Sequence, residues 1–478
     1  MDPHGMPPPP SAPNLWTHLA AAEPSSRRAC WWFLRALGIV NALAFVGVAV
    51  QIDGLAGERG ILPAAELLDR AHAQWGARAV LQLPTLAWLD ASGAGLGRLA
   101  WAGVAISGLL VANIAPALSL ALLWILYRSL AIAGGEFFYF QWDALLVEAD
   151  FLGMFAAPLH LWPRRSSSDA GPPRLAWWAL RVLLFRVMFL SGVVKLASGD
   201  PAWRDLSALA YHFESQPLPA PLAWYAHHAP PSLLQLACAA MLAIELGVSW
   251  LLFTRARRWA LAPLAGLQLA IMATGHYGFF NLLAIALCAT AWDDTRPSEA
   301  VDPRRATWPT WLLVPVLGVA LAAALPGSPM RLVVAPLGIG SPYGLFAVMT
   351  RGRPQLSFEG SRDGVTWHAY AFRRQPDDPD TAPALFVPVL ARLDWQTWLA
   401  ALGPVERTHW LERVGARLVE GSSPVARLFA GDPFPDGPPS RVRVVRWRYR
   451  FTRPDEPGWW VREREGVHEL GRPRDGRR

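Results

Sequence analysis

The stretch Arg181-Val-Leu-Leu-Phe-Arg-Val-Met-Phe-Leu-Ser-Gly-Val-Val-Lys195-Leu-Ala-Ser-Gly-Asp200 decides the fold class of this chain. It is too apolar for a surface helix of a soluble protein, and it belongs to an apolar segment long enough for a bilayer core, which requires roughly 20 helical residues. An ionisable group at membrane depth is costly and is therefore a candidate functional group. The sequence predicts a membrane helix over residues 175–197 with Lys195 near one end.

Lys195 is the only lysine among the 44 Lys and Arg residues of the chain. An ammonium can lose its proton, whereas a guanidinium effectively cannot, so Lys195 is a candidate base. Alternatively, its long side chain near a helix end reaches the membrane interface and has no chemical role. The sequence leaves both interpretations open.

Composition places the whole chain in the membrane class, since 53% of its 478 residues are hydrophobic and 25 are Trp. We predict a polytopic α-helical membrane protein with about nine spans and a C-terminal, mainly antiparallel β soluble domain. The expected spans are residues 31–50, 99–113, 116–133, 143–162, 175–197, 233–254, 259–273, 278–292 and 308–325. The two spans at 259–273 and 278–292 are short, which also fits a tilted or re-entrant hairpin.

The arginines of the short loops predict the orientation, because basic residues near span ends are retained on the cytoplasmic side. With a cytoplasmic N-terminus, three loops place their arginines inside: Arg27, Arg28, Arg164, Arg165, Arg174, Arg255, Arg257 and Arg258. The same parity sends residues 134–143, 198–231, 275–281 and everything after about 326 outward. This topology accounts for the net charge of +7 better than a nucleic-acid partner does, because no compact basic patch accompanies a nucleic-acid motif.

Five regions are expected along the chain: a disordered cytoplasmic tail (1–30), a transmembrane domain (31–326) with interfacial helices at 60–90, a linker (327–350), an extracytoplasmic β-rich domain (351–462) and a disordered basic tail (463–478). Alternation around Asp363-Gly364 predicts a hairpin over 353–372. Alternation over 441–451 predicts a further strand, and residues 393–402 and 408–419 are expected to be helical.

Polar residues gather in the segments expected at the outer face and form a candidate functional cluster. Its members are Arg128, Gln141, Asp143, Glu148, Lys195, Asp200, Tyr211, His212, Glu214, His276 and Asn281. Lys195 is expected to pair with Glu148 or Asp143. Tyr211, His212 and Glu214 could serve proton transfer or bind a partner, but anchoring of their loop at the interface is the favoured interpretation of each residue.

A deeper ion pair is expected between Arg186 and Glu245, with a structural role, because an unpaired charge near the midplane would be costly. No metal site is predicted, since His227-His228 lacks ligand spacing to another His or Cys. No cofactor is predicted, since the chain has no P-loop, no HExxH and no dinucleotide-binding glycine pattern.

Several motifs together resemble the lipase maturation factor family. They are Gly60-Ile-Leu-Pro63, Phe140-Gln-Trp-Asp143, Leu190-Ser-Gly-Val-Val-Lys-Leu-Ala-Ser-Gly-Asp200, Tyr211-His-Phe-Glu-Ser-Gln-Pro-Leu-Pro219, His276-Tyr-Gly-Phe-Phe-Asn281 and Arg392-Leu-Asp-Trp-Gln-Thr-Trp398. The resemblance implies a multi-pass membrane protein of the endoplasmic reticulum in eukaryotes. It acts there in protein maturation, as a chaperone of secreted lipases, with its C-terminal domain in the lumen.

For this chain the resemblance implies a maturation factor rather than an enzyme, with two partners: membrane lipid and an exported client protein such as a lipase. The arginine bias and short loops are typical of bacteria. We therefore expect an integral protein of a bacterial inner membrane with the C-terminal domain outside.

The membrane part is also similar to the horizontally transferred transmembrane (HTTM) group that includes vitamin K-dependent γ-carboxylase, in which a membrane lysine acts as base. Ser191-Gly-Val-Val-Lys195-Leu matches that region in outline. This similarity implies an alternative function, a membrane enzyme with Lys195 as catalytic base on a lipophilic substrate. The large substrate-binding domain of a carboxylase is not evident. A transporter is a weaker third hypothesis, because no inverted repeat is visible.

Overall fold

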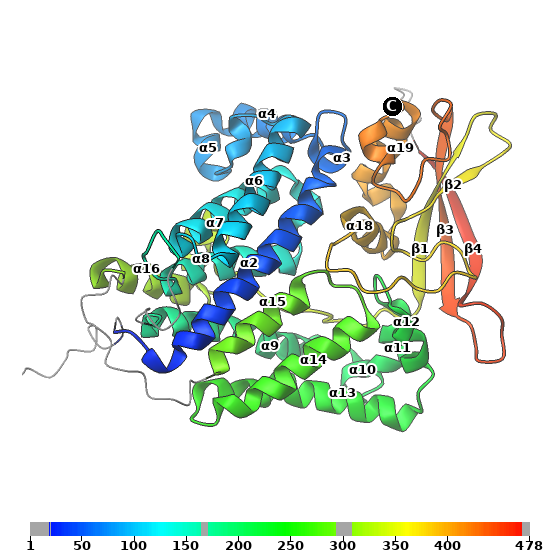
Figure 1. Ribbon diagram of the computed structural model, residues 1–478. Helices are drawn as coiled ribbons and strands as arrows, with labels where there is room; N and C mark the ends of the chain where they lie inside the picture. Colours follow the sequence, from blue (N-terminus) through cyan, green and yellow to red (C-terminus); the bar gives the residue numbers. More distant parts are fainter. Residues whose placement is uncertain (1–18, 20, 164–170, 293–307, 471–478) are drawn as a thin grey trace, which may run out of the picture.

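The computed structural model describes residues 19, 21–163, 171–292 and 308–470. A body of helices carries a four-stranded sheet at one end, with two C-terminal helices between them (Figure 1). Most of the predicted N-terminal tail, and residues 471–478 of the predicted basic tail, lie outside the described residues.

Within the described residues, a helix occurs at each of the nine predicted spans. These helices are α2 (Arg27–Ala49), α6 (Gly93–Val111), α7 (Pro116–Ala133), α8 (Gln141–Ala156), α9 (Arg174–Ala197), α13 (Pro231–Leu246), α14 (Leu261–Thr274), α15 (Phe280–Leu287) and α16 (Thr310–Ala323). Proline begins α7 and α13, where its missing N–H costs nothing. Among the described residues, four helices are long and apolar enough to cross a membrane: α2, α6, α7 and the continuous stretch Pro231–Phe253. The count of nine crossings stays a prediction.

Shorter helices occupy the segments between the long ones. The predicted helical segments within 60–90 are α4 (Ala64–Trp75) and α5 (Ala79–Gln82), preceded by α3 (Ile52–Ala56). The segment after α9 forms α10 (Pro201–Arg204), α11 (Ala208–Ser215) and α12 (Pro221–His227), and α17 (Met330–Val334) precedes the sheet. The position of α4 and α5 on a membrane surface stays a prediction.

The C-terminal sheet has the order β2-β1-β3-β4 and is antiparallel throughout. Its strands are β1 (Arg353–Ser361), β2 (His368–Tyr370), β3 (Arg441–Phe451) and β4 (Trp460–Leu470). The predicted hairpin is confirmed, and the Asp363 carboxylate accepts the backbone N–H groups of Val365 and Thr366 at 2.8 and 2.7 Å in its turn. The two predicted helices are α18 (Arg392–Ala401), against β1, and α19 (His409–Val419), against β3 and β4.

Both predicted disordered tails extend too far into the folded chain. Residues 460–470 form β4 and pair with β3, where Glu465 meets Arg448 at 2.5 Å across the two strands. The mixture of Arg and Glu that suggested disorder instead supplies opposite charges to neighbouring strands. At the N-terminus, α2 begins at Arg27, and Ala22 forms a β-bridge with Pro173.

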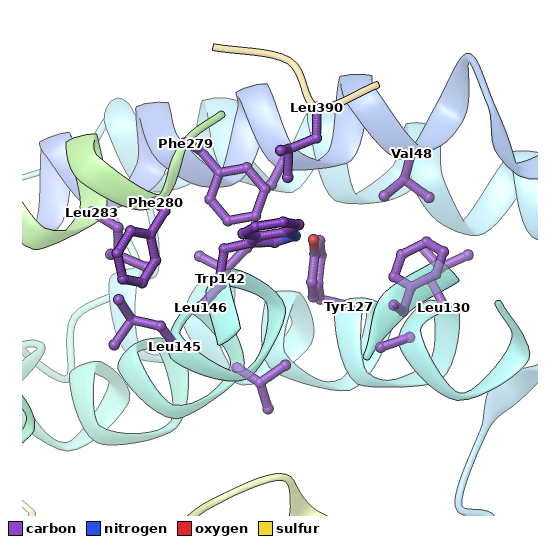
Figure 2. Close-up of a cluster of buried hydrophobic side chains, with 14 of the residues drawn as sticks. Val48, Tyr127, Leu130, Trp142, Leu145, Leu146, Phe279, Phe280, Leu283 and Leu390 are labelled. Carbon is purple, nitrogen blue, oxygen red and sulfur yellow. The ribbon is translucent and has the colours of Figure 1, made fainter. Parts of the chain in front are cut away.

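One continuous hydrophobic core joins the helical body to the C-terminal region. In Figure 2, the side chain of Leu390, from the segment before α18, points toward Phe279, Trp142 and Tyr127 of the helical body. Trp142 also meets Trp395 of α18, with ring centroids 4.6 Å apart. Because the two halves share one core, they form one packed structure.

Gly278 permits this close approach. Its φ is +56°, in the left-handed region, and a Cβ added there would lie 2.3 Å from Leu390 Cγ. Any other residue would meet both backbone strain and a steric clash.

We therefore expect Gly278→Ala to lower the unfolding temperature of the full chain, since the backbone alone costs roughly 1–2 kcal/mol per left-handed residue. Gly266→Ala in α14 is the matched control, because nothing lies within 4 Å of a Cβ built there. Thermal unfolding by intrinsic tryptophan fluorescence measures both variants. Equal unfolding temperatures for Gly278→Ala and the parent protein would contradict the packing described.

Two acidic side chains are buried in the C-terminal region. Burial raises the pKa of Asp377 to about 7. The nearby Asp394 also raises this pKa, whereas the hydrogen bond from the Phe372 backbone N–H lowers it. Burial also raises the pKa of Asp394 to about 6, although the backbone N–H groups of Gln375 and Arg374 donate to its carboxylate. Both carboxyls therefore bind a proton more tightly in the folded chain than in the unfolded chain.

This arrangement predicts that stability falls as pH rises. Above their unfolded pKa, about 3.9, both groups ionise more readily in the unfolded chain, so their contribution to stability declines between about pH 4 and 7. Asp377→Asn should reduce the difference between the unfolding temperatures at pH 5 and pH 8, whereas the exposed Asp436→Asn should not. A full pH dependence in Asp377→Asn would show that Asp377 does not carry the effect.

Candidate functional site

The residues of the predicted polar cluster do not converge on one reactive centre. The structure distributes most of them along the contact between the helical body and residues 335–470 of the same chain. We call the set of these contacts the docking interface.

The centre of the docking interface is a buried ion pair. Asp143 lies in the first turn of α8, Arg392 begins α18, and each is 2% exposed. Arg392 Nη2 donates to Asp143 Oδ1 at 2.6 Å and Nη1 to Oδ2 at 2.9 Å, in the bidentate geometry that gives the strongest such pairs. Tyr127 donates its hydroxyl to Asp143 Oδ1 at 2.6 Å and accepts from Arg392 Nη2 at 3.0 Å.

The guanidinium of Arg392 is further enclosed. Its Nη1 donates to the Phe137 carbonyl at 2.8 Å, and its carbon lies 3.7 Å from the centre of the Phe138 ring. Both charges are thus paired and hydrogen-bonded, which is the condition under which a buried ion pair is tolerated. Loss of either partner would leave the other charge buried and uncompensated.

A second pair lies deeper in the helical body. Arg186 of α9 donates to Glu148 of α8 at 2.6 Å, and the other oxygen of Glu148 accepts the Tyr343 hydroxyl at 2.8 Å. Arg186 also donates to the Ser341 carbonyl at 2.6 Å, and the Gly340 N–H donates to Glu148 at 3.2 Å. The pair therefore holds the segment that leads to the sheet.

Lys195 pairs with Glu245, at 2.6 and 2.7 Å to its two oxygens, so the predicted Arg186–Glu245 pair is wrong. The predicted pairing of Lys195 with Glu148 or Asp143 is wrong as well. Arg186 and Lys195 are nine residues apart, or two and a half helical turns, and so lie on opposite faces of α9. One face meets α8 and the other meets α13. The expected depth of a residue in the membrane does not show which face of its helix it occupies.

The segment that leads to the sheet, residues 335–351, is called the connecting segment below. Further contacts hold it along its length. Arg128 donates to the carbonyls of Pro336 and Ala335, each at 3.1 Å. The amide of Gln141 exchanges two hydrogen bonds with the backbone of Gly344, at 2.9 and 3.2 Å.

The end of the segment is held by the loop after α9. Asp200 accepts the Met349 N–H at 2.7 Å and the Arg351 guanidinium at 2.8 Å. Tyr211 lies under the same Arg351, with 5.1 Å from guanidinium carbon to ring centre.

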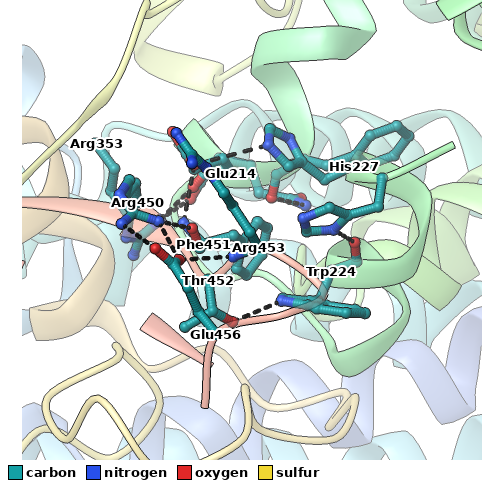
Figure 3. A network of polar contacts seen from close by, with 12 residues as sticks. Glu214, Trp224, His227, Arg353, Arg450, Phe451, Thr452, Arg453 and Glu456 are labelled. Carbon is teal, nitrogen blue, oxygen red and sulfur yellow. Dashed lines mark hydrogen bonds and ion pairs between the residues drawn. The ribbon is translucent and has the colours of Figure 1, made fainter. Parts of the chain in front are cut away.

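The loop after α9 contacts the sheet through the polar network in Figure 3. Glu214 accepts the Phe451 N–H of β3 at 2.9 Å, and Trp224 donates to the Thr452 hydroxyl at 3.1 Å. Arg353 of β1 is fully buried and donates to the carbonyls of Glu214, Gln216 and Pro217. In the structure this segment therefore binds the sheet of the same chain, while its predicted anchoring at the membrane interface stays a prediction.

His276 binds the C-terminal region through both ring nitrogens. Its Nε2 lies 2.5 Å from the Ala384 carbonyl, and its Nδ1 accepts the Val387 N–H at 3.4 Å. These partners fit the neutral ring with the proton on Nε2, and burial lowers the pKa of His276. His212 and Asn281, in contrast, face a cavity beside Lys195 and Glu245.

Residues of the docking interface that the sequence analysis missed include Tyr127, Tyr343, Arg353 and Arg392. Arg392 stands in one of the motifs quoted for the family resemblance, which is the one signal that singled it out. The other three have no local pattern, because their partners are distant in the sequence. No group of three metal-ligating side chains occurs within the residues that the structure describes.

Comparison with known proteins is consistent with this architecture. The profile described as "Lipase maturation factor transmembrane domain" matches residues 28–298, and "Lipase maturation factor C-terminal domain" matches residues 339–469. The second profile thus begins within the segment that the docking interface holds. No solved structure matches the chain.

Full-length relatives give the same result. Lipase maturation factor 2 of Homo sapiens is 33% identical over 90% of this chain and 80% of its own length. Lipase maturation factor 1 of Bos taurus is 30% identical over 97% of this chain and 93% of its own length. This chain belongs to the lipase maturation factor family and is an integral membrane protein.

Proposed function

We propose that this protein assists the folding of an exported client, a lipase, at the extracytoplasmic face of a bacterial inner membrane. The observation that carries the proposal is the docking interface, which fixes the C-terminal region against one end of the helical body. A rigid surface beside the membrane suits a factor that holds a partly folded protein. The names of the relatives supply the client class.

Contacts of the loops support the proposed topology. Three segments expected on the outer side contact the C-terminal region: η4 (Gly135–Phe138) against α18, the loop after α9 against β1, and His276 against Ala384. Charge bias predicts that these segments share one side of the membrane. We therefore assign residues 31–326 to the membrane domain, 327–350 to the linker, and the sheet region from 351 to Leu470 to the outside.

The client-binding surface is proposed at a cavity of about 330 Å³ between the start of α8, the linker and α18. Tyr139 and Val348 line it and are 79% and 66% exposed, and Leu402 lines it from the end of α18. Exposed apolar side chains beside a concave surface mark sites that bind protein segments. An apolar segment of an unfolded client would enter here.

The enzymatic alternative gains no support. The relatives carry the names of maturation factors, and both carboxylate oxygens of Glu245 contact the Lys195 ammonium. Deletion of the gene with measurement of secreted lipase activity per molecule tests the proposed function directly. Unchanged activity and abundance of every exported lipase would contradict it.

Breaking the central ion pair should uncouple the two halves. Arg392→Met leaves Asp143 buried without its partner, which costs roughly 3–5 kcal/mol. We expect loss of the folded full chain and of lipase activation in cells. The exposed pair Arg413–Glu66 provides the matched control, since Arg413→Met should cost at most about 1 kcal/mol.

The double variant Arg392→Met/Asp143→Leu removes both charges and should recover part of the lost stability, because no uncompensated charge remains. Thermal unfolding and protease resistance measure the recovery. A double variant that is as unstable as the sum of the single variants would show that the pair is not a coupled unit.

Polar substitution of the outer cavity should weaken client binding without unfolding the protein. We expect Tyr139→Ser/Val348→Ser to lower secreted lipase activity, while Val365→Ser, 82% exposed at the distant hairpin, leaves it unchanged. Photo-crosslinking from position 402 to a co-expressed lipase identifies the contact. Normal lipase activation by a folded double variant would place the client elsewhere.

A further inference from the structure

A second cavity, of about 220 Å³, lies between α9, α13 and α14. Its walls are mainly apolar and include Met188, Met241 and Ile271. Side chains with polar groups also line it, among them Lys195, His212, Glu245, Gln268 and Asn281. An apolar cavity with a few placed polar groups is the usual form of a small-molecule site.

The mouth of this cavity lies between α13 and α14. Ala237 and Ala270 line the cavity and are exposed, and their small side chains leave the passage open. Around them Leu236 and Leu269 are 65% and 57% exposed. Ala237 lies six residues into α13, about 9 Å from its start at 1.5 Å per residue. The mouth therefore faces the acyl chains of the membrane, and a ligand enters from the bilayer.

The polar end of the cavity carries no net charge. Lys195 and Glu245 neutralise each other at 2.6 and 2.7 Å. Burial lowers the pKa of His212 to about 4, so its ring is neutral at physiological pH. A charged head group would find no free counter-charge among the described residues that line the cavity.

Asn281 and His212 offer atoms that can form a hydrogen bond with a ligand. Asn281 is 1% exposed and donates its amide N–H to Gln268 Oε1 at 2.8 Å, which orients its Oδ1 away from that partner. The Oδ1 atom has no hydrogen-bond partner among the described residues. His212 contacts the rings of Phe213 and Phe346 through edge-on packing, and its nitrogens make no hydrogen bond within the described part of the chain. An unsatisfied buried acceptor is costly, and a ligand hydroxyl that donates to it would remove this cost.

We propose that this cavity binds an uncharged, hydroxyl-bearing membrane lipid through one acyl chain, and that the lipid hydroxyl donates to Asn281 Oδ1. The acyl chain lies along the apolar walls and leaves between Ala237 and Ala270. This site lies beyond the proposed function, since it takes a lipid rather than the client protein.

The test uses the purified full chain in phosphatidylcholine nanodiscs with a clickable, photoactivatable monoacylglycerol. Ala237→Trp fills the mouth, and Ala240→Trp is its control, because Ala240 is exposed on the same helix but does not line the cavity. Ala270→Trp and Ala273→Trp form a second matched pair on α14. We expect labelling to fall about tenfold in the two mouth variants and in Asn281→Leu, since loss of about 1.4 kcal/mol corresponds to tenfold in affinity.

Each outcome decides the proposal. Adducts mapped by mass spectrometry to α9, α13 or α14, lost in Ala237→Trp or Ala270→Trp but kept in the controls, would support it. Equal labelling of folded mouth and control variants would overturn it and identify only surrounding bilayer lipid. Competition by excess fatty acid as strong as by monoacylglycerol would also overturn it, because an anion is excluded by the charge balance. Normal labelling in folded Asn281→Leu would overturn the assigned hydrogen bond. None of these measurements depends on lipase activation.

Discussion

The buried ion pair between Asp143 and Arg392 links the helical body to the C-terminal region. It joins the first turn of α8 to the first turn of α18 with Tyr127 as a shared neighbour, at a point where an unpaired charge would be costly. Once α18 is fixed there, Trp395 reaches Trp142, and the preceding Leu390 packs beside Gly278. The sheet follows, because α18 packs against β1.

The polar residues at one end of the helical body therefore mainly bind residues 335–470 of the same chain. Carboxylates and amides of α8 and the loop after α9 bind backbone groups of the connecting segment and the sheet, where those groups would otherwise be buried without partners. Two cavities lie beside these contacts. The outer one suits an apolar client segment, and the inner one, beside Lys195 and Glu245, suits a lipid.

The helices and strands were largely predictable, because apolar segments, an Asp363-Gly364 turn and alternation in 441–451 are local signals. The partners of the charged residues were not. Glu148, Glu245, Arg186 and Lys195 were identified as candidates for ion pairs, but helix faces decided which of them meet, and a depth argument does not resolve faces. Arg392 was missed as a partner because its contacts lie 249 residues away in the chain. The ends of the fold were misjudged since cross-strand Arg and Glu pairing looks like a disordered charged tail in sequence alone.

The sheet region docks on one end of the helical body, and we propose that this end is extracytoplasmic. The most direct test labels single introduced cysteines in intact cells with a membrane-impermeant maleimide, because the three native cysteines are buried. Asp436→Cys, exposed beside the sheet, should label in intact cells, whereas Thr254→Cys, exposed in the loop before α14, should label only after the membrane is permeabilised. Labelling of Thr254→Cys in intact cells together with protection of Asp436→Cys would contradict the account.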